Sequence, residues 1–174
     1  SRAQEELNWK SAFLEALTHS AIDGILVVDS QGRKILQNQR TADLFKIPRH
    51  IVEDPDDTRQ VRWVMDMTRH PDQFREKVVH LYAHPSEISR DEIELTDGTV
   101  LDRYSSPVLG KDGACYGRIW TFRDITELKQ REAALRESEE RVRAALQASH
   151  TGTFWWDILS NELVWDDALH ALFG

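Results

Sequence analysis

A chain of 174 residues has room for one ordinary domain and extra segments, but it is short for two complete domains. Apolar residues form 40% of it and charged residues 30%, a balance that supports a buried core and excludes the disordered and fibrous classes. The net charge of −8 argues against nucleic-acid binding, and no apolar run approaches the roughly 20 residues that cross a bilayer, so we expect a soluble globular protein without nucleic-acid or membrane contact.

The first segment, residues 1–20, predicts an amphipathic helix from Glu5 to Ser20. Its apolar residues recur near helical spacing among charged ones, which should give the helix one apolar face. These residues are Leu7, Trp9, Phe13, Leu14 and Leu17.

A β-hairpin is predicted next. Residues 24–29 (GILVVD) are a short β-branched run, residues 34–39 (KILQNQ) form a second strand, and Ser-Gln-Gly is the turn between them. Asn38 can cap a short helix over residues 40–47, because its side-chain oxygen can accept a free backbone N–H there. Pro48 should end that helix.

The middle of the chain is predicted to be helical. Residues 49–58 are rich in Asp and Pro and predict a loop. Two helices over residues 59–70 and 71–84 should follow, separated at Pro71, because proline disfavours helical backbone in the residue before it.

Three strands in series are predicted over residues 90–95, 99–108 and 115–126, joined by Asp-Gly turns. With the first hairpin they make five strands, with the short helices between. This order predicts the α+β class, in which an antiparallel sheet carries helices on one side.

A long linker helix is predicted over residues 127–149, which contain no Gly or Pro and are rich in Ala, Leu, Glu and Arg. Leu128, Leu135 and Val142 recur every seven residues, as in one column of a coiled coil, although the alternate column is polar. A homodimer through the two flanking helices is therefore one interpretation.

Residues 145–174 repeat the plan of residues 16–47, each copy starting at the end of a helix. Each copy has a Gly, an apolar strand that closes in Asp (Asp29, Asp157), a turn, a second strand, and a short helix that ends in Leu-Phe. The second copy stops at Gly174, before any strand that could close a sheet. We therefore expect residues 150–174 to be the truncated start of a second domain.

Four stretches resemble the Per-Arnt-Sim (PAS) family. They are GILVVD, the Asn38-led helix ending ADLF, TDGTVLDRYSSPV and GRIWTFRDITE. The last is the most specific, because a strand that ends in Asp-Ile-Thr and runs into a long charged helix is characteristic of PAS sensors in bacterial signalling proteins. The resemblance covers residues 15–126 in full and about 150–174 in part.

The resemblance implies a five-stranded antiparallel sheet curved around a small cavity, with residues 21–126 as the sensor domain. It also implies that the exit helix carries a signal to an effector in the same chain. By family habit this effector is a histidine kinase or a cyclic-di-GMP enzyme, and residues 1–174 favour neither.

Asp124 and Thr126 are the candidate residues for signal transmission. A carboxylate and a hydroxyl at a strand-to-helix junction can cap the helix and couple it to the sheet. The alternative is that they form only a cap. Arg103, Arg118 or Arg123 could pair with Asp124, and the sequence does not choose among them.

The cavity candidates are Arg103, Ser105, Trp120, Phe122 and Tyr82. Alternation along residues 100–108 puts Arg103 and Ser105 on one face, and the family pattern suggests that Trp120 and Phe122 point into the cavity. An inward guanidinium needs an acidic partner, which is either an internal carboxylate or a bound anionic metabolite. The aromatic residues are otherwise expected to fill the core.

The sequence gives little support for a haem or flavin cofactor. Haem-binding PAS sensors take an axial ligand from the helical middle, where His80 is the one mid-helix histidine, but exposed or capping histidines are the favoured reading. Light-sensing flavin relatives need a Cys in an Asn-Cys-Arg-Phe-Leu stretch, which is absent, so that photochemistry is excluded. The single cysteine, Cys115, fits a reducing compartment and a cytoplasmic location.

No nucleophile–base pair, phosphate loop or HExxH motif is present, which predicts a regulatory module rather than an enzyme. Two functions remain open. The chain is either a sensor of ligand or redox state that acts through its flanking helices, or a ligand-free dimerisation and spacer module.

Overall fold

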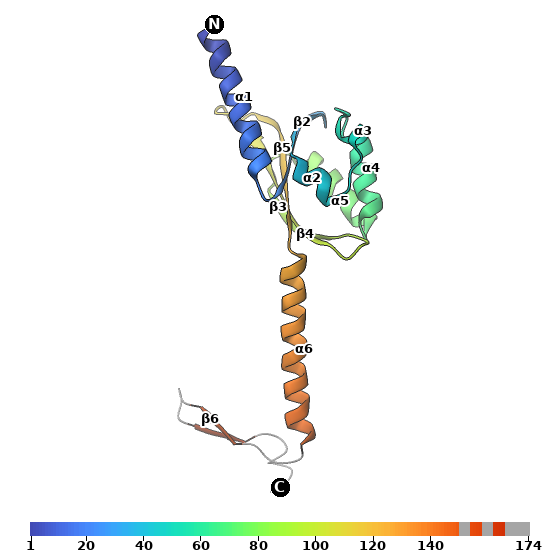
Figure 1. The fold of residues 1–174 in the computed structure, drawn as a ribbon, viewed down its shortest axis with the longest axis vertical. Coiled ribbons are helices and arrows are strands. Elements are labelled where there is room, and N and C mark those ends of the chain that lie inside the picture. Colours follow the sequence, from blue (N-terminus) through green and yellow to red (C-terminus); the bar gives the residue numbers. More distant parts are fainter. Residues whose placement is uncertain (150–153, 158–161, 166–174) are drawn as a thin grey trace. The chain divides into compact units, whose positions relative to one another are not determined.

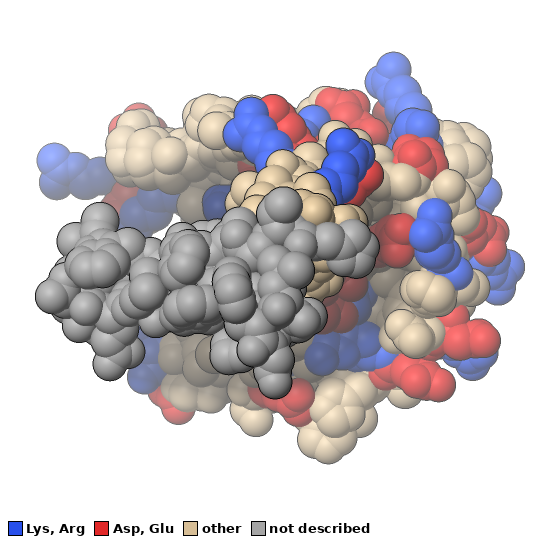
Figure 2. Space-filling view, turned by 90° about the horizontal axis from the view of Figure 1, so that it is seen from below, with Lys and Arg blue, Asp and Glu red and all other residues tan. Residues whose placement is uncertain are grey.

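The computed structural model describes residues 1–149, 154–157 and 162–165. The chain divides into two compact units, Ser1–Thr126 and Glu127–Gly174. Basic and acidic side chains of the described residues are interspersed on the face shown in Figure 2. None of the described helices combines the length and the apolar character needed to cross a bilayer.

The first unit is built on one five-stranded sheet with the strand order β2-β1-β5-β4-β3. All of its neighbouring strands are antiparallel, which confirms the predicted α+β class. The strands are β1 (Gly24–Asp29), β2 (Lys34–Gln37), β3 (Ser89–Glu94), β4 (Val100–Leu109) and β5 (Cys115–Asp124).

Four short helices lie on the same side of this sheet (Figure 1). They are α2 (Gln39–Leu44), α3 (Arg49–Val52), α4 (Thr58–Met67) and α5 (Pro71–Ala83). The prediction of a loop over residues 49–58 was wrong at α3. The carbonyl of Pro48 accepts hydrogen bonds from the amides of Ile51 and Val52, each at 3.0 Å, and burial of Ile51 stabilises the extra turn.

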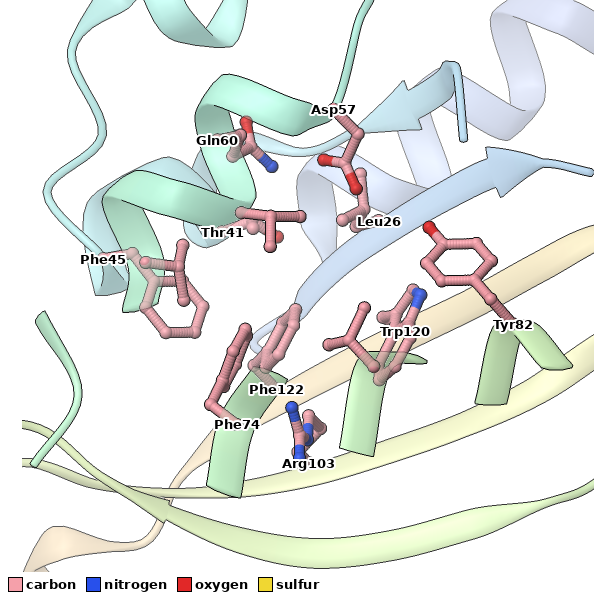
Figure 3. Close-up of a pocket in the computed structure, with 13 residues that line it drawn as sticks. Leu26, Thr41, Phe45, Asp57, Gln60, Phe74, Tyr82, Arg103, Trp120 and Phe122 are labelled. Atoms are coloured by element: carbon pink, nitrogen blue, oxygen red, sulfur yellow. The ribbon is translucent and has the colours of Figure 1, made fainter. Parts of the chain in front are cut away.

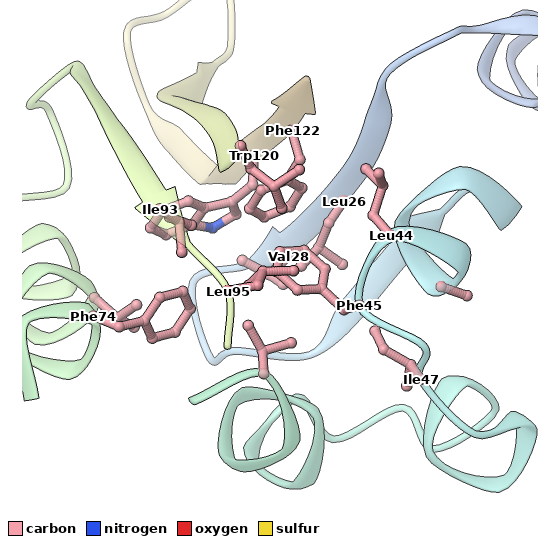
Figure 4. Packing of buried hydrophobic residues seen from close by; sticks show 14 of the residues in the cluster. Leu26, Val28, Leu44, Phe45, Ile47, Phe74, Ile93, Leu95, Trp120 and Phe122 are labelled. Carbon is pink, nitrogen blue, oxygen red and sulfur yellow. The ribbon is translucent and has the colours of Figure 1, made fainter. Parts of the chain in front are cut away.

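The core lies between the helices and the inner face of the sheet (Figure 4). Alternate residues of β1, such as Leu26 and Val28, point into it, as period-two strand geometry requires. Phe45, which follows α2, meets Phe122 of β5 edge to face, with ring centroids 4.9 Å apart. These contacts join the helical layer to the central strand.

Asn38 caps α2 as predicted, and it also ties several other segments together. Its Oδ1 accepts hydrogen bonds from the backbone amides of Thr41 and Ile25, at 3.2 and 2.8 Å. Its Nδ2 donates to the carbonyls of Thr18 and Asp23, at 2.8 and 2.9 Å. One buried amide therefore joins the end of the first helix, β1 and the start of α2.

The first helix, α1 (Arg2–Ser20), begins three residues before the predicted start. The Oγ of Ser1 accepts a hydrogen bond from the amide of Gln4 at 3.3 Å and so caps it. None of its residues is buried, and the five apolar side chains of its predicted stripe are 48–64% exposed.

The second unit contains most of α6 (Thr126–Ala148), which confirms the predicted long helix. Ion pairs at i, i+4 spacing, such as Arg131 with Glu127, support it along its surface. Leu128, Leu135 and Val142 are exposed, and their coiled-coil role stays a prediction.

Two strands, β6 (Phe154–Asp157) and β7 (Glu162–Trp165), pair in antiparallel register. The short helix predicted after them lies outside the described residues. The assignment of residues 150–174 to a second domain therefore stays a prediction.

Replacement of Asn38 by alanine should lower the free energy of unfolding by roughly 2–4 kcal/mol, because it leaves several buried backbone groups without partners. Asn38→Asp keeps the Oδ1 acceptor but sets a second acceptor oxygen against the carbonyls of Thr18 and Asp23, so we expect a loss at least as large. Urea unfolding followed by circular dichroism measures both variants, with the exposed Asn8→Ala as control. If Asn38→Ala lost no more unfolding free energy than Asn8→Ala, the role of Asn38 in joining these segments would be contradicted.

Candidate functional site

A cavity lies between the inner face of the sheet and helices α4 and α5 (Figure 3). The centre of a water-sized sphere can move through about 40 Å³ of it, so the cavity admits only a few waters or a very small molecule. Its wall is formed by Leu26, Thr41, Phe45, Asp57, Gln60, Val61, Val64, Phe74, Val78, Tyr82, Arg103, Trp120 and Phe122.

Arg103 is the one basic residue of the cavity wall, and its side chain is only 3% exposed. Directly across the β3–β4 ladder, Asp91 accepts hydrogen bonds from Nε at 2.9 Å and from Nη2 at 2.6 Å. The guanidinium lies over the rings of Phe74 and Trp120, with its carbon 4.7 and 5.5 Å from their centroids. The internal salt bridge, one of the two alternatives for Arg103, is therefore present.

One atom of that guanidinium remains unsatisfied. Arg103 Nη1 is buried and has no hydrogen-bond partner among the described residues. A second cavity, of about 60 Å³, meets Arg103 and Phe74 from the side of Asp91. Arg103 thus separates two internal spaces and keeps a free donor.

Asp57 is the acidic counterpart in the cavity wall, and it is 6% exposed. Its Oδ1 is buried without a hydrogen-bond partner among the described residues. Burial raises the pKa of Asp57 from 3.8 to about 6, while the charge of Lys34 acts in the opposite direction. The site therefore holds a carboxyl group that changes its charge near neutral pH.

An open hollow of about 400 Å³ adjoins the cavity. The two spaces share Asp57, Val61, Val78 and Tyr82 as walls. Tyr82 is 40% exposed, so it lies at the border between protein interior and solvent. Movement of these side chains would join the cavity to the surface.

A second buried arginine, Arg118 of β5, lies outside the cavity wall. Its Nη1 donates to Ser105 Oγ at 3.0 Å. Its Nη2 donates to the carbonyl of Glu87 at 2.7 Å, and more weakly to those of His84 and Pro85. Arg118 therefore fastens the connection between α5 and β3 to the centre of the sheet.

The structure brings four of the five predicted cavity residues together, namely Arg103, Trp120, Phe122 and Tyr82. Ser105 does not line the cavity. Its hydroxyl donates to the carbonyl of Ile119 at 3.0 Å and accepts from Arg118. The role of the four residues in ligand binding stays a prediction.

Tyr116 does not share the inward face of Arg118 and Trp120, since it is 60% exposed. The β4–β5 register shifts between Val108 and Leu109, which breaks the alternation. Gly117 makes this possible, because a Cβ there would lie 2.0 Å from the carbonyl oxygen of Val28.

His80 does not reach the cavity. Its side chain is 47% exposed and its Nε2 lies 2.8 Å from Glu87 Oε2. An axial haem ligand needs an enclosed pocket around it, and the described residues provide none at His80.

The strand-to-helix junction is built by Asp124 and Thr126. Asp124 Oδ1 accepts hydrogen bonds from the amide and the hydroxyl of Thr126, at 2.9 and 2.5 Å. Thr126 Oγ1 in turn accepts from the amide of Val100, at 3.0 Å. The three arginines proposed as partners of Asp124 have other partners. Arg123 pairs with Asp23, and the partners of Arg103 and Arg118 are those described above.

The sequence reasoning missed Asp57, Thr41 and Gln60 as cavity residues. Asp57 lies in a stretch with three other acidic residues, and nothing in that pattern distinguishes the buried carboxyl from its exposed neighbours. Thr41 and Gln60 carried the weaker signal of a polar residue on the apolar side of a short helix.

Comparison with known proteins agrees with this geometry. A sequence profile described as "PAS fold" matches residues 19–133. The PAS domain from Bordetella pertussis BvgS superposes with a TM-score of 0.52 at 21% identity, covering 74% of this chain and 98% of that one. An RNA-binding light-oxygen-voltage receptor gives 0.52 at 16% identity, covering 75% and 37%. At these identities the structures share the fold alone.

The sensor region of a sensor histidine kinase is also similar, with a TM-score of 0.48 at 16% identity. That match covers 61% of this chain, which spans only 40% of the length of the other protein. No curated protein sequence matched the chain.

Loss of the Asp91 carboxylate should be costly, because it leaves the buried guanidinium of Arg103 uncompensated. We expect Asp91→Asn to lower the free energy of unfolding by about 2–4 kcal/mol. Asp102→Asn breaks the pair with Arg90 on the same two strands, where the Arg90 side chain is 73% exposed, and should cost about 1 kcal/mol or less. Equal losses for the two variants in urea unfolding would refute this account.

The raised pKa of Asp57 predicts a pH-dependent stability. The folded state binds this proton more tightly than the unfolded state, so the contribution of Asp57 to the free energy of unfolding falls as pH rises from about 4 to about 6. A shift of the Asp57 pKa from 3.8 to about 6 corresponds to roughly 3 kcal/mol of folding free energy. Asp57→Asn should therefore be more stable than the wild type at pH 7 by up to that amount. Near pH 4 the two proteins should be equally stable.

Urea unfolding of both proteins at several pH values measures the difference. Asp56→Asn serves as control with the opposite sign, because hydrogen bonds from Thr58 lower the pKa of Asp56. Its wild-type carboxylate stabilises the fold above pH 4 and loses that effect as pH falls. A wild-type curve parallel to that of Asp57→Asn would rule out the raised pKa.

Proposed function

The chain belongs to the PAS family, and on that premise we propose that it is a non-enzymatic sensory module that binds a small molecule in its cavity and transmits the binding through its flanking helices. The observation that carries the proposal is the pair of buried, unsatisfied polar atoms in one apolar cavity, Arg103 Nη1 and Asp57 Oδ1. Buried polar atoms without partners are costly, and a ligand that satisfies them recovers part of that cost.

The two atoms define the chemical class of the ligand. Arg103 Nη1 is a donor, so the ligand needs a carboxylate or carbonyl oxygen at that end. Asp57 takes a hydroxyl or amine donor when ionised. Because Asp91 already offsets the charge of Arg103, the best match is a compact hydroxy acid or amino acid rather than a multiply charged anion.

The proposed signal path follows the two strands that line the cavity. Arg103 lies on β4 and Trp120 lies on β5. The start of β4 and the end of β5 both lie close to Thr126. The hydroxyl of Thr126 joins the amide of Val100 at the start of β4 to the carboxylate of Asp124 at the end of β5. A shift of one strand against the other thus changes the geometry at the first residue of α6.

We propose that the output is an effector domain in the same chain, a histidine kinase or a cyclic-di-GMP enzyme, as is usual for the family. The free thiol of Cys115 fits a reducing compartment, and we assign the domain to the cytoplasm. The full-length protein would then be a signalling enzyme under the control of this domain.

A second candidate function is ligand-free dimerisation. It is favoured by the exposed apolar side chains on both flanking helices, among them Leu14 and Leu17 on α1 and Leu135 on α6. In this case the cavity would hold only water. Oligomerisation and sensing are compatible, so the decisive question is whether the cavity takes a ligand.

Native mass spectrometry for a co-purifying molecule, followed by thermal shift with hydroxy acids and amino acids, tests the sensor. A ligand at 100 times its Kd should raise the Tm by roughly 5–10 °C. Arg103→Lys keeps a charge opposite Asp91 but removes Nη1, so the shift should disappear, as it should in Asp57→Asn. Arg90→Lys on the outer face is the matched control and should keep it.

The transmission step is tested in the same protein. Thr126→Val removes the link to Val100, so the ligand should still raise the Tm while no longer altering amide hydrogen exchange in the first turn of α6. A dimer that no library member stabilises, with no co-purifying molecule, would reject the sensor in favour of the spacer.

A further inference from the structure

A cluster of metal-binding side chains lies on the outside of the molecule, at the end of α5 and in the connection to β3. His80 lies in the last turn of α5 and His84 is the residue that follows the helix, and their rings stack with centroids 4.2 Å apart. Glu87 follows in the connection. One potential ligand atom from each residue lies within 4.8 Å of the other two. None of the three residues lines the cavity.

We propose that His80, His84 and Glu87 bind a divalent first-row transition metal, with Zn²⁺ as the representative ion. Two imidazoles and one carboxylate form a ligand set that zinc accepts, and the exposed side leaves the remaining position to water. The site is separate from the proposed ligand cavity, so it stands or falls independently of the sensor function.

The hydrogen bonds around the two rings favour metal binding. His84 Nδ1 lies 2.8 Å from the backbone carbonyl oxygen of His80. A carbonyl can only accept, so Nδ1 carries the hydrogen and the neutral ring keeps the lone pair on Nε2 for a metal. Such a bond from the second ring nitrogen to a carbonyl is typical of histidines that bind metals.

The existing contact between His80 and Glu87 is close to the geometry that a metal requires. Their Nε2 and Oε2 atoms are 2.8 Å apart. Two ligands of a tetrahedral zinc ion with bonds of about 2.0 Å lie roughly 3.3 Å apart, so a small separation of the pair admits the ion. Both side chains are more than 40% exposed, which leaves them free to make this adjustment.

The backbone at Glu87 is fixed. The carbonyl of Glu87 accepts a hydrogen bond of 2.7 Å from the buried Arg118. Because the sheet holds Glu87 in place, little further ordering is needed when a metal binds.

Bound metal would clamp the end of α5 to the segment that Arg118 anchors. Phe74, Val78 and Tyr82 of α5 belong to the cavity wall. A metal at this place would therefore restrict the movement of a helix that lines the cavity.

Isothermal titration of the metal-free, tag-free chain with Zn²⁺ tests the proposal. We expect one ion per chain, a rise in Tm with Zn²⁺, and affinity at least about tenfold weaker in His84→Ala, His80→Ala and Glu87→Gln. The three residues are on the surface, so these variants should fold, and an unchanged Tm without metal verifies it.

His70→Ala, at the other end of α5, and His50→Ala are matched controls and should bind Zn²⁺ as the wild type does. Cys115→Ser should also bind normally. Wild-type affinity in His84→Ala and Glu87→Gln would overturn the proposal. So would loss of binding in Cys115→Ser, because it would assign the metal to the thiol instead.

Discussion

Two guanidinium groups buried on the inner face of one sheet are the constraint around which the domain is arranged. A buried charge needs a partner, and the two arginines find different ones. Arg103 takes a carboxylate from the adjacent strand, Asp91, together with two aromatic faces. Arg118 takes three backbone carbonyls and a hydroxyl, and thereby dictates where the connection after α5 must lie. The first arginine supplies the one basic group of an otherwise largely apolar cavity wall, and the second holds the connection that follows α5.

Helix α5 lies next to both candidate sites of this molecule, the cavity and the proposed metal site. Its inner side contributes Phe74, Val78 and Tyr82 to the cavity wall, and its outer side presents His80 and His84. Its end is held by Arg118 from β5, the strand that also carries Trp120 and ends at Asp124. Direct contacts therefore join both the inner side and the end of α5 to the central strand.

The features that depend on local pattern were predictable from the sequence. The succession of strands along the chain and the cap at Asn38 follow from short-range periodicity and turn chemistry, and alternation along β4 places Arg103 and Ser105 on one face. The features that depend on tertiary packing were not. Asp57 looks like its acidic neighbours until α4 buries it, and α3 forms within an Asp- and Pro-rich stretch because Ile51 is drawn into the core. The exposure of Tyr116 depends on a backbone shift near Gly117 that breaks the alternation, and such shifts have no clear sequence signal beyond the glycine.

The attachment of α1 through Asn38 determines where the helix can pivot. None of its residues is buried, so the side-chain amide of Asn38, bound to the carbonyl of Thr18, is its firm connection to the sheet. A helix of 19 residues is about 28 Å long, so a tilt of about 5° at its pinned end moves the free end by more than about 2 Å. A rearrangement near β1 that tilts the helix about this amide would therefore displace its free end further than its pinned end.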